Sequence, residues 1–451
     1  MKGIKPKKQG RAYLLFLISL VTIYYSLFTD VYALDVKRTV LPNGLSVLYL
    51  ERHNLPIVMV TLLVKASPLD EPPNQAGLSN LTAELLTEGT KKRKASEISD
   101  ETDFIGASLG ASVNDDYTTV SLSVLKKDVQ EGFEIFSDVL LNPSFPDDEI
   151  KRTKELVKGS LRQDEEEPTF LAAKAFKKAV YGDLPYGRLV RGSLETVGAL
   201  KREDITKFHS VYYRPNNSFL SIVGDLTEDE MRSLVGKFLS GWKSAGVPKR
   251  PVIEEPGKER KTVLINRDLT QASILLGHAG ISRGNPDYYA VTVMNYILGG
   301  GGFSSRLMQK VRVESGLAYD IHSLFAPFRE GGLFEVGGQT KNISANTVIG
   351  LVNEEIERIR TERVSEQELN DAKAYLTGSF PRRLDTNRKI ADFLVVAEYY
   401  AFGLDYAEKY PLYVNSVSRD GVLRVAKKYL DPSGIVTVVV GKQSEVSLKN
   451  E

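Results

Sequence analysis

SFPDDEIKRTKELVKGSL, residues 144–161, returns later in the chain as RVSEQELNDAKAYLTGSF, residues 363–380. The two stretches align without a gap at a constant offset of 219 residues, and NNSFLSIVGDL at 216–226 is matched by PSGIVTVVVGK at 432–442. The chain is therefore predicted to be a tandem duplication of one domain. Four identities support the first alignment: Glu149 with Glu368, Lys154 with Lys373, Gly159 with Gly378, and Ser160 with Ser379.

Each copy is predicted to form an α+β layered domain. The first copy contains apolar runs at residues 45–50 and 57–65 that are typical of strands, and a β-rich stretch at 112–125. Strands in blocks with helices gathered on one side define the α+β class, here in two tandem copies. Helices are expected to begin at two capping boxes, Thr227-x-x-Glu230 and Ser365-x-x-Glu368.

The segment GWKSAGVPKRPVIEEPGKERK, residues 241–261, separates the copies. It contains three prolines, three glycines and many charges, and it interrupts the periodic apolar pattern. This composition is typical of a linker. The predicted domains are therefore residues 34–240 and 262–451.

Residues 1–33 carry the pattern of a secretory signal peptide. Five basic residues precede the apolar run Tyr13–Phe28, and Val31-Tyr32-Ala33 offers small residues where a signal peptidase would cut, after Ala33. An uncleaved membrane anchor is the alternative, because the apolar run approaches the length of a bilayer span. The basic residues are Lys2, Lys5, Lys7, Lys8 and Arg11.

Composition limits the possible functions of the exported chain. Cleavage after Ala33 would remove five basic side chains and one acidic one, so the formal net charge would fall from +1 to −3. Nucleic-acid binding is not expected, because phosphate contacts require a concentrated basic surface. The chain has no cysteine, which excludes disulfides and thiolate ligands. A large exported chain without cysteine fits the bacterial periplasm.

The stretch LGGGGFSSRLMQKVRVESGLAY, residues 298–319, holds the candidate functional side chains. Its pattern predicts the end of a helix, a left-handed residue at Gly316 and then a strand, with Arg312 and Tyr319 on one corner. Both side chains are donors that could bind a carbonyl oxygen as charge develops on it. The alternative is a basic helix end followed by a tyrosine packed in the core. Gly299, Gly300, Gly301 and Gly302 would suit contact with an extended peptide or a simple connection between helices.

No metal site can be assembled from local sequence. The four histidines, His53, His209, His278 and His322, have no second His or Glu at metal-ligand spacing. The glycine run also lacks the Lys-Ser/Thr that follows a phosphate-binding loop, so nucleotide binding is not supported.

Several motifs together resemble the insulinase/pitrilysin family of zinc metallopeptidases, over residues 36–442. They are the 298–319 stretch, Asp287-Tyr288-Tyr289 before it, and Tyr213-Arg214-Pro215-Asn216-Asn217 at the end of the first copy. The half-length members, similar to mitochondrial processing peptidase, are the nearest in plan. The resemblance implies that each half is an α/β roll, with a mixed, mainly antiparallel sheet and helices on one side. It also implies that two chains close around a chamber for peptides, and that the catalytic chain binds zinc through an H-x-x-E-H helix and a distant Glu.

The matching segment here, AGLSNLTAELLTEGT at residues 76–90, lacks the zinc ligands. Asn80 and Glu84 stand where the two His ligands belong, Ala83 where the general-base Glu belongs, and Ser160 nearest to the third ligand. An amide and one carboxylate do not replace two imidazoles, and alanine cannot deprotonate water. This chain is therefore expected to bind no metal or other cofactor, and zinc is expected on a partner chain.

The resemblance implies that Arg312 and Tyr319 reach across the chamber to the partner's zinc site, where they bind substrate and stabilise the oxyanion. Gly299–Gly302 and Phe303 would then line the peptide path. The predicted function is the non-zinc subunit of a heterodimeric periplasmic metallopeptidase, inactive alone. Two alternatives remain open: a non-enzymatic peptide-binding or scaffold protein, a homodimer if no partner exists, and a zinc peptidase with displaced ligands.

Overall fold

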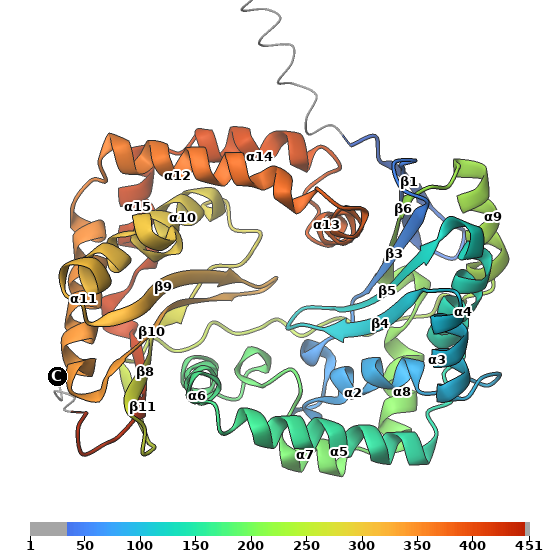
Figure 1. Cartoon of the computed structure of the whole chain (residues 1–451), viewed down its shortest axis with the longest axis horizontal. Coiled ribbons are helices and arrows are strands. Elements are labelled where there is room, and N and C mark those ends of the chain that lie inside the picture. Colours follow the sequence, from blue (N-terminus) through green and yellow to red (C-terminus); the bar gives the residue numbers. More distant parts are fainter. Residues whose placement is uncertain (1–33, 447–451) are drawn as a thin grey trace, which may run out of the picture.

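The computed structural model describes residues 34–446, which form two halves that are each built on one β-sheet (Figure 1). In the first half the strand order is β1-β2-β6-β3-β5-β4, and only β2 and β6 pair in parallel. These strands are β1 (Lys37–Val40), β2 (Ser46–Glu51), β3 (Ile57–Val64), β4 (Ser108–Val113), β5 (Thr118–Leu125) and β6 (Ser218–Gly224).

The second sheet repeats the first without an equivalent of β1. Its order is β7-β11-β8-β10-β9, with β7 and β11 parallel and the other pairs antiparallel. The predicted duplication of an α+β unit with a mixed, mainly antiparallel sheet is confirmed. The strands are β7 (Lys261–Asn266), β8 (Gln271–Ala279), β9 (Ala318–Pro327), β10 (Gly332–Lys341) and β11 (Val436–Gly441).

Helices cover the sheets and close their apolar faces. The capping boxes at Thr227 and Ser365 are present, since each hydroxyl accepts the N–H of a glutamate whose carboxylate accepts the N–H of the cap residue. First-half helices are α2 (Leu78–Glu84), α3 (Ala95–Phe104), α4 (Val129–Leu141), α5 (Asp147–Asp164), α6 (Pro168–Tyr181), α7 (Leu194–Ala199), α8 (Arg202–Tyr212) and α9 (Glu228–Leu239). Second-half helices are α10 (Tyr288–Asn295), α11 (Ala345–Thr361), α12 (Glu366–Ser379), α13 (Asn387–Tyr399), α14 (Tyr406–Asn415) and α15 (Arg419–Tyr429).

The two halves exchange one helix each. Helix α6 leaves the first half and packs on β8 and β11, where Phe176 and Val180 join the apolar side chains of the second sheet. Helix α13 makes the reciprocal crossing, and its Ile390 and Leu394 pack against Leu48 and its neighbours in the first sheet. The residue pattern does not predict this exchange, which holds the two sheets in contact with each other's helices.

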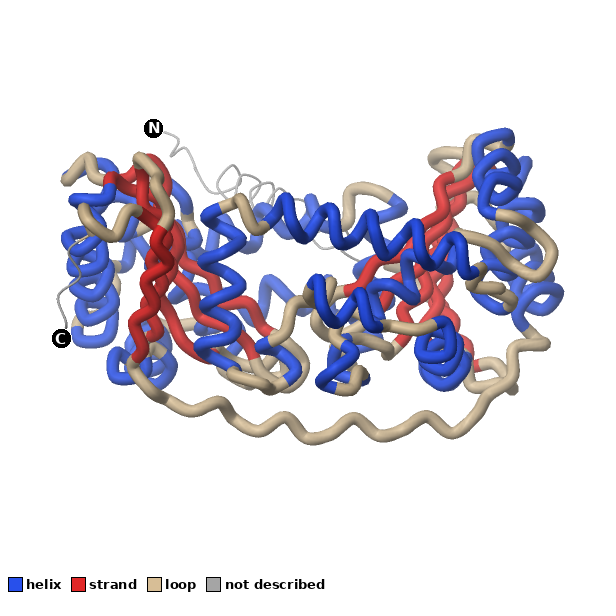
Figure 2. Tube along the Cα trace, turned by 90° about the horizontal axis from the view of Figure 1, so that it is seen from below, coloured by secondary structure: helices blue, strands red, loops and turns tan. Residues whose placement is uncertain are grey.

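A long segment without helix or strand connects α9 to β7 and runs along one side of both halves (Figure 2). Arg250 in this segment is fixed by an ion pair with Asp70 at 2.8 Å and by a hydrogen bond to the hydroxyl of Tyr399 at 3.0 Å. Within residues 34–446, no helix combines the length and apolar character required to cross a bilayer. The predicted signal peptide, residues 1–33, lies outside the described residues.

His209 on α8 provides a pH-dependent element of the first-half core. One ring nitrogen lies 2.9 Å from the carbonyl oxygen of Leu140, and the ring stacks on Tyr213. Burial lowers the pKa of His209 to about 4. Its folded pKa is below the unfolded value, so folding stability should be lost as pH falls from about 6.5 to about 4, by up to about 3 kcal/mol. Urea unfolding at pH 7 and pH 4 measures this loss.

His209→Gln serves as the comparison for that experiment, because glutamine keeps a donor for the Leu140 carbonyl and does not titrate. The variant is expected to lose clearly less stability than the parent between the two pH values. Equal losses in both proteins would refute the assignment.

Candidate functional site

Arg312 and Tyr319 lie on a corner where a helical segment turns into a strand. Residues 308–314 form a π-helical turn, Gly316 follows with a φ of +63°, and β9 begins at Ala318. The predicted helix end, left-handed glycine and strand start are therefore confirmed. A positive φ suits glycine, which has no β-carbon to clash.

A β-bulge sets the direction of Tyr319. Strand β9 is the edge strand of its sheet, and Ala318 pairs with Thr340 whereas Ile321 pairs with Gly338. Two β9 residues, Tyr319 and Asp320, therefore lie opposite the single residue between these partners on β10. A bulge bends the strand and re-aims side chains. Both residues point away from the core, and the Tyr319 side chain is 82% exposed.

Arg312 is held between two aromatic rings. Its guanidinium carbon lies 4.6 Å from the ring centre of Phe303 and 4.3 Å from that of Tyr319. One guanidinium nitrogen donates to the backbone carbonyl oxygen of Tyr319 at 2.6 Å. The guanidinium makes no other hydrogen bond or ion pair with residues 34–446, so its remaining N–H donors are open to a ligand. The alternative of a tyrosine packed in the core is wrong, because Tyr319 is exposed and its ring stacks on Arg312.

Three of the four glycines have a packing reason. A β-carbon at Gly299 would lie 2.5 Å from the backbone nitrogen of Ser323, and at Gly301 it would lie 2.7 Å from the carbonyl oxygen of Tyr296. At Gly300 it would lie 2.8 Å from a side-chain nitrogen. Gly302 instead has open space and a φ of +56°. Close packing thus explains Gly299–Gly301, against β9 for Gly299 and against the preceding residues Asn295 and Tyr296 for Gly300 and Gly301. Peptide binding by the glycines and Phe303 stays a prediction.

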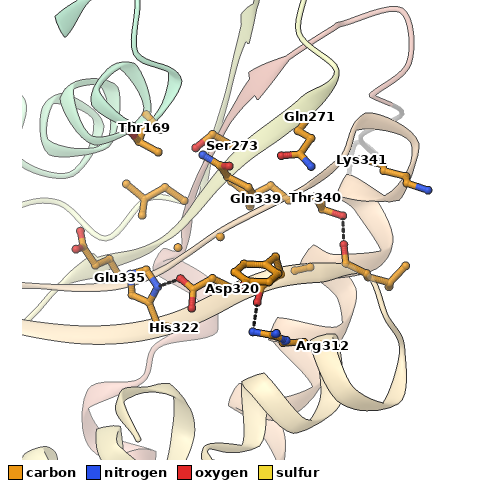
Figure 3. A pocket seen from close by; sticks show the side chains of 18 of the residues that line it. Thr169, Gln271, Ser273, Arg312, Asp320, His322, Glu335, Gln339, Thr340 and Lys341 are labelled. Carbon is orange, nitrogen blue, oxygen red and sulfur yellow. Dashed lines mark hydrogen bonds and ion pairs between the residues drawn. The ribbon is translucent and has the colours of Figure 1, made fainter. Parts of the chain in front are cut away.

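A cavity of about 760 Å³ opens beside the arginine and tyrosine (Figure 3). Strands β8, β9 and β10 form its floor, and α6 from the first half contributes Thr169 to its wall. His322 and Asp320 pair at 2.9 Å in it. Glu335 also lines it. Its carboxylate has no hydrogen bond or ion pair within the described part of the chain, and burial raises its pKa. This volume and mixture of apolar and polar lining are typical of ligand sites.

The helix that resembles the zinc-binding helix is α2, in the first half. Asn80 donates its amide to the Glu84 carboxylate at 2.8 Å, and Ala83 is buried. Burial raises the pKa of Glu84, whereas the hydrogen bond from Asn80 opposes that shift. Ser160 on α5 accepts a hydrogen bond from Arg191 at 2.7 Å. The sequence does not predict this contact, because Arg191 belongs to no recognisable motif.

This group of side chains does not fit zinc. Zinc sites use imidazole, thiolate or carboxylate ligands, three or four together. Here an amide nitrogen points its hydrogens at the carboxylate, and a guanidinium donates to the serine. Within residues 34–446, no group of three or more His, Cys, Asp or Glu side chains is arranged to hold a metal ion.

Two family models match consecutive parts of the chain. The model described as Insulinase (Peptidase family M16) matches residues 46–193, and the model described as Peptidase M16 inactive domain matches residues 199–376. The sheet order, the duplicated plan and these matches define an insulinase-type peptidase fold. The chain belongs to the insulinase family, peptidase family M16.

Relatives of similar length are named zinc proteases. The chain is 24% identical over 357 residues to the uncharacterized zinc protease YmxG of Bacillus subtilis. The aligned region covers 79% of this chain and 86% of that protein. It is 26% identical over 404 residues to an uncharacterized zinc protease of Rickettsia bellii, which covers 89% of this chain and 90% of that protein.

Solved structures share the whole architecture. A peptidase M16 inactive domain from Pseudomonas fluorescens superposes with a TM-score of 0.85 at 27% identity, covering 92% of this chain and 100% of that chain. A protease from Helicobacter pylori has the same fold, with a TM-score of 0.83 at 20% identity, covering 90% of this chain and 100% of that chain.

Proposed function

We propose that this chain is the non-zinc subunit of a heterodimeric peptidase of the M16 family. In this role it supplies Arg312 and Tyr319 to a peptide that is cleaved at the zinc site of a partner chain. We place the complex in the periplasm on the basis of the N-terminal signal pattern.

One observation carries the proposal. The arginine and tyrosine are fixed at the rim of a large cavity with free donors, whereas the helix that would bind zinc is built from Asn80, Ala83 and Glu84. A guanidinium and a phenol stabilise a developing oxyanion when they are preorganised about 3 Å from it. They do not activate water by themselves. A division of the active site between two chains accounts for both features.

Mixing the chain with its partner tests the proposal. The purified chain alone is expected to contain no stoichiometric zinc and to cleave no peptide. Addition of an H-x-x-E-H chain of the same family from the same organism is expected to produce a complex that cleaves unfolded peptides. Metal analysis, size-exclusion chromatography and a fluorogenic peptide assay on one preparation measure the three quantities.

Two other results would decide against the proposal. Stoichiometric zinc together with peptide cleavage by the chain alone would indicate a zinc peptidase with atypical ligands, as the names of its relatives would suggest. A chain that binds extended peptides but associates with no peptidase would indicate a binding or scaffold protein. The open cavity and the edge strand β9 suit that second function as well.

A further inference from the structure

Arg191 reaches into the group of side chains that stands where the family's metal site would be. It belongs to a loop just before α7, and its side chain extends to α5. One guanidinium nitrogen donates to the Ser160 hydroxyl at 2.7 Å, and another forms an ion pair with Asp164, one turn further along the same helix. A single arginine thus contacts the position nearest to the third metal ligand and the carboxylate beside it.

The backbone of the same loop is packed against the start of α2. A β-carbon at Gly192 would lie 2.2 Å from the carbonyl oxygen of Ala76, and a β-carbon at Gly77 would lie 2.7 Å from that of Arg191. Both glycines have positive φ, +73° for Gly192 and +95° for Gly77. The loop and the helix therefore approach as closely as backbone allows, which fixes where the Arg191 side chain begins.

The charge of Arg191 also acts on Glu84. This carboxylate stands at the second-histidine position, and burial raises its pKa, whereas the Asn80 hydrogen bond and the Arg191 charge counter the rise. One cation therefore pairs with Asp164 on α5 and favours the charged form of Glu84 on α2 through its field. A buried or half-buried carboxylate needs such a partner, because an isolated charge is costly away from water.

We propose that Arg191 is a built-in cation that occupies the degenerate metal site, joins α2 to α5 and closes the site to metal ions. The site has then not only lost its metal ligands, because the Arg191 guanidinium also takes the place of the metal ion. A guanidinium carries a permanent positive charge and a rigid set of donors, so it contacts Ser160 and Asp164 directly and acts on Glu84 through its charge, without zinc. This inference does not depend on the role of Arg312 and Tyr319.

Restoration of the ligands tests the proposal by zinc binding alone. A variant with Asn80→His, Ala83→Glu, Glu84→His and Ser160→Glu is compared with the same variant that also carries Arg191→Ala. Isothermal titration with Zn²⁺ is expected to give an affinity at least about 100-fold higher when Arg191 is removed, because the guanidinium fills the site and repels a second cation. Equal affinity in the two variants would overturn the proposal.

Arg162→Ala in the restored variant controls for net charge, since Arg162 is an exposed arginine on α5, the helix that carries Ser160. A gain in affinity equal to that from Arg191→Ala would also overturn the proposal.

A second measurement uses the chain without the restored ligands. Arg191→Met is expected to lower Tm by roughly 2–4 °C, with partial recovery in Arg191→Lys and no change in Arg162→Ala. An unchanged Tm in Arg191→Met would contradict the joining role.

Discussion

Replacement of Arg312 by alanine is expected to lower the kcat of the assembled peptidase by about 100–1000-fold, the usual cost of losing one oxyanion donor. The variant loses the free guanidinium donors, and it also loses the stack that holds Tyr319. Tyr319→Phe removes only the phenol donor, because the ring can still stack on the arginine, so its kcat is expected to fall less. Peptide turnover by the reconstituted complex at saturating substrate measures both effects.

The same experiment separates catalysis from assembly. Lys310→Ala alters a half-exposed side chain of the same helical segment, whose partner is Glu314, and should leave kcat unchanged. The three variants are expected to bind the partner chain as the parent does, because Arg312 and Tyr319 line the cavity and Lys310 pairs with Glu314 on its own helical segment. If Arg312→Ala retained full kcat, or if it lost activity only through failure to associate with the partner, the oxyanion role would be wrong.

The duplicated plan could be predicted because it rests on local signals. The helical stretch at residues 144–161 and the glycine-terminated strand at 216–226 each recur in the second half, and the structure places their copies in corresponding elements, α5 with α12 and β6 with β11. The exchange of α6 and α13 could not be predicted. The residues of α6 indicate that one face is buried, as Phe176 and Val180 are, but the pattern does not state which sheet they meet.

The candidate site likewise contains one feature that could be predicted from the sequence and two that could not. The corner at Gly316 was predictable, since a left-handed glycine between helix and strand is a local feature. The bulge that turns Tyr319 outward depends on the register between β9 and β10, and the contact of Arg191 with Ser160 joins residues 31 positions apart. Contacts between residues that are distant in the sequence determine both features, so the local sequence pattern does not predict them.

Asp116 is the polar centre where the two halves meet. It lies in the turn between β4 and β5 and is only 4% exposed. Its carboxylate accepts hydrogen bonds from the hydroxyls of Tyr186 and Tyr400, at 2.7 and 3.0 Å, and from the backbone N–H of Arg329, at 2.9 Å. Arg329 belongs to the turn between β9 and β10, so this one carboxylate joins the hairpin tips of the two sheets.

Asp116→Ala is therefore expected to lower the free energy of unfolding by about 3 kcal/mol, since three donors lose a buried acceptor at about 1 kcal/mol each. Urea unfolding followed by circular dichroism reports on both halves. The fluorescence of Trp242, the single tryptophan, reports on the first-half core, where it is buried.

Because α6 and α13 cross between the halves, the two signals are expected to move together in Asp116→Ala. Asp183→Ala, which removes a fully exposed carboxylate, should move neither. A shift confined to the fluorescence transition would mean that Asp116 stabilises the first half alone, and the carboxylate would then not couple the halves. Coincident shifts would instead indicate that the second half, which carries Arg312, and the first half, which carries α2, unfold as one unit.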